Sequence, residues 1–130
     1  MRRIVIIFFS LLLLSSYSFA QKEKYESLFI YNFTKYIKWP DSYNEGRFLI
    51  GVLGNSDIYG SLQTMAGTKK KTGTGAAIEV KKYESFEDMD DCNILFISTD
   101  AIDNLTEIEE ATANKPVLII TDTPGMANQG

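Results

Sequence analysis

The pattern of apolar positions begins with a short stretch near the N-terminus. Residues 4–14 read IVIIFFSLLLL directly after two arginines, and small side chains follow at Ser18 and Ala20. A positively charged N-terminus, a short apolar segment and small residues before a cleavage site are typical of a secretory signal peptide. A transmembrane helix needs roughly 20 apolar residues, so this stretch is too short. We predict a signal peptide over residues 1–20, cleaved after Ala20, and no stable membrane insertion of the mature chain; an uncleaved anchor is the alternative.

The next pattern has the period of a helix. From Lys22 onwards, apolar residues recur at intervals of three and four, which is typical of an amphipathic helix. Pro40 ends the pattern, because the residue before a proline is pushed out of the helical conformation. Burying a large apolar side chain contributes about 1.5–3 kcal/mol, so we expect this stripe to face the core. It consists of Tyr25, Leu28, Phe29, Phe33, Tyr36 and Ile37.

Short apolar segments without alternation follow, and such segments are typical of parallel strands covered on both faces. They are residues 48–53, 93–97 and 116–121, and residues 76–80 are predicted as a further strand with weaker apolar content. Helical patterns around residues 58–65 and 102–113 separate them, so strands and helices alternate as in α/β proteins. Right-handed crossovers then place helices on both faces of the sheet. We predict an α/β fold with an open, mostly parallel sheet of at least four strands.

The last residues, from Gly125 to Gly130, have the composition of a loop that leads into another element. The strand predicted at residues 116–121 would then form an exposed edge, which folded proteins usually protect. We therefore predict one domain that starts at residue 21 and whose C-terminal part is missing after residue 130.

The composition excludes several classes of function. Without residues 1–20, the chain carries 11 basic and 17 acidic residues, and an acidic chain without a concentrated basic face is a poor nucleic-acid binder. The Lys69–Lys71 cluster is interpreted as a solvated loop. With no histidine and one cysteine, the chain lacks the usual zinc ligands and the Ser-His-Asp and Cys-His catalytic groups. We predict no catalysis, no metal and no cofactor.

One turn is a candidate ligand site. Gly54, Asn55, Ser56 and Asp57 follow the first predicted strand, and open α/β sheets bind ligands beyond the carboxyl ends of their strands. Backbone N–H groups at the start of the next helix could hold an anion there. The alternative is an ordinary turn in which these side chains cap the helix.

Cys92 lies immediately before the third predicted strand. A free cysteine in such a position usually acts as a small buried hydrophobe. A redox-sensitive thiol is the alternative.

Four segments together resemble one known family. They are Tyr36-Ile-Lys-Trp39-Pro40, Phe48-Leu-Ile-Gly-Val-Leu-Gly54, Cys92-Asn-Ile-Leu-Phe-Ile-Ser98 and Lys115-Pro-Val-Leu-Ile-Ile-Thr-Asp122. In this order, after an aromatic helix in an exported chain, they resemble the YfiR family of periplasmic regulators over about residues 23–130.

The resemblance implies a periplasmic, non-enzymatic inhibitor. The best-known member of the family binds the periplasmic domain of an inner-membrane diguanylate cyclase and holds the enzyme inactive. The resemblance leaves other membrane sensors, including histidine kinases, open as partners. The family's redox regulation uses several cysteines, but only Cys92 matches here, so disulfide switching does not transfer. The family's domain also continues past Gly130, in agreement with the truncation predicted above.

A regulator of this kind needs a docking surface, and aromatic residues are enriched at binding hot spots. Tyr31, Trp39 and Tyr43, around the end of the first helix, are the candidates for the partner surface. Core packing of Trp39 is the alternative. A homodimer is left open, and a periplasmic small-ligand-binding module that uses the Gly54–Asp57 turn is the alternative function.

Overall fold

The computed structural model describes residues 1, 17–43, 45–71 and 73–126. The apolar stretch of the predicted signal peptide and the last four residues of the chain lie outside these ranges. Within them, no helix has both the length and the apolarity needed to cross a membrane.

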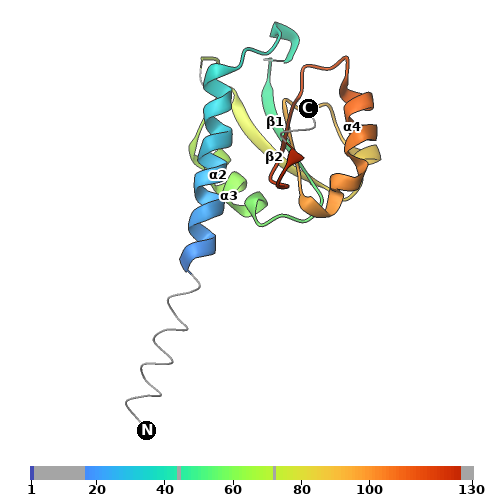
Figure 1. Ribbon diagram of the computed structural model, residues 1–130. Coiled ribbons are helices and arrows are strands. Elements are labelled where there is room, and N and C mark those ends of the chain that lie inside the picture. The colour runs from blue at the N-terminus through green and yellow to red at the C-terminus, as the bar shows by residue number, and fades with distance from the viewer. Residues whose placement is uncertain (2–16, 44, 72, 127–130) are drawn as a thin grey trace.

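Four parallel strands form one open sheet in the order β2-β1-β3-β4 (Figure 1). They are β1 (Arg47–Leu53), β2 (Ala77–Tyr83), β3 (Ile94–Ile97) and β4 (Leu118–Thr121). β1 lies in the middle, where Ile50 is opposite Val80 on one side and Ile94 on the other. Every residue of β3, and every residue of β1 except the first, is buried, which explains their unbroken apolar sequence. The predicted α/β fold with a parallel sheet is confirmed.

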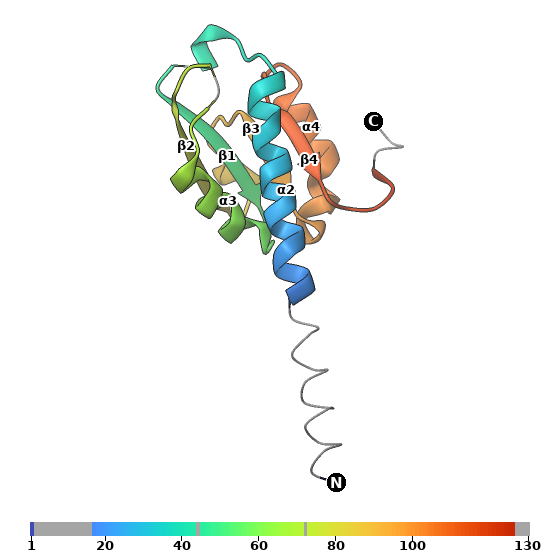
Figure 2. The same ribbon diagram turned by 90° about the vertical axis from the view of Figure 1, so that its left-hand side faces the viewer.

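The helices cover both faces of this sheet, as predicted. α2 (Tyr17–Tyr36) and α3 (Ile58–Thr68) lie side by side on one face, and α4 (Leu105–Thr112) lies on the other (Figures 1 and 2). Alternate residues of β1 enter two cores: Ile50 packs with α2 and α3, and Leu53 packs with α4. The connections contain the 3-10 helices η1 (Asp41–Tyr43), η2 (Phe86–Asp88) and η3 (Thr99–Asn104).

The orientation predicted for the first helix is wrong for most of its stripe: Phe33 and Ile37 are half-buried against the core, but the other four residues are exposed. α2 ends at Tyr36, before Pro40, and its predicted apolar stripe points largely into solvent. Tyr25 is 68% exposed, Phe29 64% and Tyr36 81%. The residues of α2 that are buried against the sheet and α3 are instead Ser27, Ile30 and Thr34.

Small hydroxyl side chains explain this orientation. The Ser27 hydroxyl donates a hydrogen bond to the Lys24 carbonyl at 2.8 Å, and the Thr34 hydroxyl donates to the Tyr31 carbonyl at 2.7 Å. Each hydroxyl satisfies its own hydrogen bond within the helix, so burying it carries little penalty. Short side chains on this face let α2 approach its neighbours closely, and the large aromatic side chains remain on the outer faces.

β4 forms one edge of the sheet. Among the described residues it pairs only with β3, and its four residues are half-buried. In the described part of the chain β4 is thus an edge strand, as predicted, and the C-terminal part expected after residue 130 stays a prediction.

Candidate functional site

Trp39 belongs to the core and not to an exposed surface, so the core-packing alternative holds for this residue. Its indole ring packs edge-to-face on Phe48, with centroids 4.9 Å apart. Its Nε1 donates a hydrogen bond to the backbone carbonyl of Asn93 at 3.1 Å. The Asn93 side chain extends this network, because its Nδ2 donates to the Tyr43 carbonyl and its Oδ1 accepts from the Leu49 N–H, both at 2.8 Å. Trp39 thus helps to fix the segment after α2 to the sheet.

The other two predicted docking residues are half-buried. Tyr43 packs against the core beside α2 and α3. Tyr31 lies between two lysines, with the Lys35 Nζ 5.1 Å and the Lys69 Nζ 5.8 Å from its ring centroid. Because Trp39 is buried, the three predicted aromatic residues do not form one exposed patch.

Exposed aromatic side chains lie elsewhere on α2. The sequence-based prediction assigned them to the core and missed their exposure. Tyr25, Phe29 and Tyr36 share one face of the helix, which we call the aromatic stripe. Phe29 also packs edge-to-face on Phe33, with centroids 5.2 Å apart. A largely apolar groove of about 420 Å³ separates part of this stripe from β4, and Tyr25, Phe29 and Ile120 line it. The buried face of Ser27, Ile30 and Thr34 contains two polar residues, so no apolar pattern in the sequence indicated this exposure.

The predicted ligand turn is already occupied by a side chain of the protein itself. The Asn55 backbone N–H donates to both carboxylate oxygens of Asp100, at 3.1 and 3.2 Å. The Asn55 side-chain amide donates to the same carboxylate at 3.3 Å, and the Ser98 hydroxyl donates to it as well. These hydrogen bonds, led by that of Ser98, lower the pKa of Asp100 below its usual value. Asp100 therefore takes the Asn55 N–H and side-chain amide, which an anion bound at this turn would otherwise use, and the ligand role of the turn stays a prediction.

Gly54 makes this contact between the turn and Asp100 sterically possible. Its φ of +84° lies in the region that residues with a side chain rarely adopt. A Cβ at this position would also lie only 2.6 Å from Asp100 Oδ1 and 3.0 Å from the Ala101 Cβ.

The remaining residues of the turn have different roles. The Ser56 hydroxyl accepts a long, 3.4 Å hydrogen bond from the Ile58 N–H, whereas the side chain of Asp57, at the N-cap of α3, makes no capping bond. The open groove beside the turn measures about 490 Å³ and is lined by acidic residues on α2 and on the strand ends, together with two lysines: Glu23, Glu26, Asp57, Asp122, Lys22 and Lys82. Across the described ranges, no three His, Cys, Asp or Glu residues are placed to hold a metal ion.

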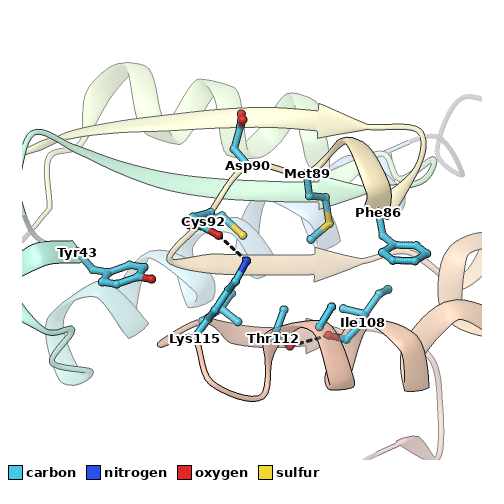
Figure 3. A pocket seen from close by; sticks show the side chains of 11 residues that line it. Tyr43, Phe86, Met89, Asp90, Cys92, Ile108, Thr112 and Lys115 are labelled. Carbon is cyan, nitrogen blue, oxygen red and sulfur yellow. Dashed lines mark hydrogen bonds and ion pairs between the residues drawn. The ribbon is translucent and has the colours of Figure 1, made fainter.

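Cys92 is 5% exposed, so its predicted burial is confirmed. It borders a small cavity of about 80 Å³ between the η2 segment and α4, where Figure 3 shows Met89 and Thr112 on opposite sides. Desolvation by burial raises the pKa of the thiol to about 11, which keeps it protonated at neutral pH. A thiol in this state is a poor nucleophile. Its redox role stays a prediction.

A family model described as YfiR/HmsC-like matches residues 23–130. The match therefore includes all four strands and most of α2. No curated protein and no solved structure matches the chain.

Proposed function

Because the chain belongs to the YfiR/HmsC-like family, whose members are periplasmic regulatory domains, we propose that it binds and inhibits a membrane-anchored signalling protein. The target is the periplasmic part of a diguanylate cyclase or a sensor kinase. The protein acts by binding and not by catalysis, after export with the signal peptide of residues 1–20. Family membership is the observation that carries this proposal.

The aromatic stripe on α2 is the docking surface that we propose for this partner. Tyr25, Phe29 and Tyr36 are each more than 60% exposed, although aromatic side chains are usually buried when the fold requires them. Exposed apolar patches on folded proteins often mark protein interfaces, and tyrosine is enriched at hot spots. In this proposal the aromatic stripe replaces Trp39 as the candidate docking surface, because Trp39 is buried.

Gene deletion combined with complementation tests this function. We expect deletion to raise the output of a membrane signalling protein, measured as cyclic-dinucleotide level or as activity of a kinase reporter. The wild-type gene should restore inhibition. A Phe29→Ala/Tyr36→Ala variant should fold normally, as measured by circular dichroism, and should fail to restore inhibition. The matched Phe29→Tyr/Tyr36→Phe variant keeps both rings and should restore it.

The possible results separate the two parts of the proposal. A deletion that changes no membrane signalling output would show that the protein is not an inhibitor of this kind. If deletion raises output but the double alanine variant restores inhibition fully, the function stands and the aromatic stripe is not the docking surface.

A further inference from the structure

The lysines of this acidic protein are unevenly distributed. Outside residues 1–20 there are 11 basic residues, and five of them form ion pairs with carboxylates: Lys22, Arg47, Lys81, Lys82 and Lys115. The other six have no carboxylate partner among the described residues, which include every Asp and Glu of the chain. Three of these six lie on α2 or just after it, where Lys38 follows the end of the helix, and three lie in the segment after α3, where Lys71 is buried: Lys24, Lys35, Lys38, Lys69, Lys70 and Lys71.

Tyr31 joins these two segments. Its hydroxyl donates a hydrogen bond to the Lys70 carbonyl at 3.2 Å, and the Lys35 and Lys69 ammonium groups lie near its ring. Attraction between a cation and an aromatic ring restrains the ammonium group without neutralising its charge. Both ammonium groups are thus positioned in advance and keep their capacity to bind an anionic group.

A groove runs beside these lysines, between α2 and α3. It measures about 390 Å³, and Figure 2 shows the two helices next to each other on one face of the sheet. Lys24 and Leu28 of α2 line it, and Tyr31 and Lys35 continue the same helical stripe at the spacing i, i+4, i+7 and i+11. Positive charge therefore follows the groove along α2, and Leu28 adds an apolar contact. We call this surface the lysine groove.

The α3 side of the groove is unusually open. Gly60 lines the groove, and Gly67 lies two turns further along α3; a Cβ at either position would meet nothing within 4 Å. Glycine lowers helix stability relative to alanine, and the packing of this protein does not require either one. The space in front of Gly60 lets another backbone approach α3 closely.

We propose that the lysine groove binds a carboxylate-rich segment of the signalling protein; this inference rests on the function proposed above. Charge complementarity is the reason for an acidic segment: Lys24 lines the groove, Lys35 and Lys69 lie beside Tyr31 at its continuation, and none of the three pairs with a carboxylate of the described residues. The hollow shape favours a protein segment over a lipid surface. A surface that binds a flat membrane usually has basic and apolar side chains that project from the same face. Here the aromatic stripe and the lysine groove lie on different faces of α2.

Binding to defined probes tests the groove directly. The probe is a synthetic helical peptide of repeating Glu-Ala-Ala-Leu units, and its control replaces each glutamate with glutamine. We expect the mature protein to bind the glutamate peptide, less tightly as salt is raised because the ion pairs are screened. The Lys35→Glu/Lys69→Glu variant should bind at least about tenfold more weakly. The matched Lys81→Glu/Lys115→Glu variant, with the same change in net charge elsewhere, should bind within about twofold of wild type.

A second variant blocks the groove without changing its charge. Gly60→Leu should raise the helix propensity of α3 and still weaken peptide binding, because the new side chain fills the space that the partner needs. Weaker binding by a variant that is at least as stable as wild type cannot come from unfolding.

Several results would overturn the inference. One is that the wild type does not bind the glutamate peptide. Another is that the wild type and the Lys35→Glu/Lys69→Glu variant bind this peptide equally. A third is that the variant loses binding to phosphatidylglycerol vesicles but binds the peptide as the wild type does, which would mean that the lysines bind a lipid surface. In the signalling assay, full inhibition by the Lys35→Glu/Lys69→Glu variant would reject the lysine groove and leave the proposed function intact. A gene deletion without effect would instead reject the proposed function, and peptide binding would still report on the groove.

Discussion

Replacing Ile30 with alanine tests which face of α2 packs against the rest of the protein. Ile30 is 2% exposed and lies in the core formed with α3 and the sheet. Alanine removes most of its side chain, and truncations of buried isoleucine cost about 2–5 kcal/mol because a cavity remains. Tyr36→Ala is the matched control on the same helix. Tyr36 is 81% exposed, so roughly a fifth of the 1.5–3 kcal/mol of a fully buried large side chain is lost, about 0.3–0.6 kcal/mol.

Urea unfolding followed by circular dichroism measures both changes. A domain of this size has about 5–15 kcal/mol of stability, so the Ile30→Ala variant should still fold and give a complete transition. We expect its free energy of unfolding to fall by at least about 1.5 kcal/mol more than that of Tyr36→Ala. Equal losses, or a larger loss for Tyr36→Ala, would mean that α2 packs through its large aromatic residues. The orientation of the helix, and both docking surfaces built on it, would then be wrong.

Further predictions concern the turn and the buried thiol. Gly54→Ala should be strongly destabilising in thermal unfolding, because it combines a positive φ with overlap on Asp100; a melting temperature equal to wild type would contradict this packing. Asp100→Asn should lower stability at pH 7. Since the folded pKa of Asp100 is lowered, its stabilising effect is complete above the ordinary carboxyl pKa of about 4 and is lost as pH falls through the lowered pKa, so a difference between wild type and variant that does not shrink on acidification would refute the argument. Cys92, with a pKa of about 11, should resist alkylation at pH 8 in the native protein and react after denaturation; rapid native labelling would support the redox alternative.

The sheet could be predicted from the sequence because its central strands are covered on both sides. β1 and β3 leave no polar position between their apolar residues, and that pattern is independent of which helix covers which face. Their lengths were also set by local signals, since Gly54 and Ser98 follow the last residue of each strand.

The orientation of α2 could not be predicted in the same way. Periodicity weighs residues by hydrophobicity, and Tyr25, Phe29 and Tyr36 dominate that measure. The fold instead uses Ser27 and Thr34, whose hydroxyl groups are satisfied inside the helix itself. Whether a stripe of large residues faces a core or a partner depends on the shape of the neighbouring surface, which local sequence does not contain.

Two features of the candidate site depend on contacts between distant parts of the chain. Asp100 lies 45 positions after Asn55, and only the parallel pairing of β1 and β3 brings the carboxylate to the turn. Trp39 reaches the carbonyl of Asn93, 54 positions away, for the same reason. The sequence indicated that the turn after β1 and the segment around Trp39 were candidate sites. It could not show that the Asp100 carboxylate contacts the turn, or that Trp39 is buried.

The three faces of α2 predict three separable kinds of variant. Changes at Ile30 should alter stability and, through unfolding, every activity of the protein. Changes at Phe29 should leave stability nearly intact and weaken inhibition at all salt concentrations, because apolar contacts are not screened. Changes at Lys35 should weaken inhibition mainly at low salt, where ion pairs contribute most. If the two docking faces contact one partner independently, their effects on binding free energy should add in the Phe29→Ala/Lys35→Glu double variant. Non-additive effects would mean that the aromatic stripe and the lysine groove bind one continuous element of the partner that passes across α2.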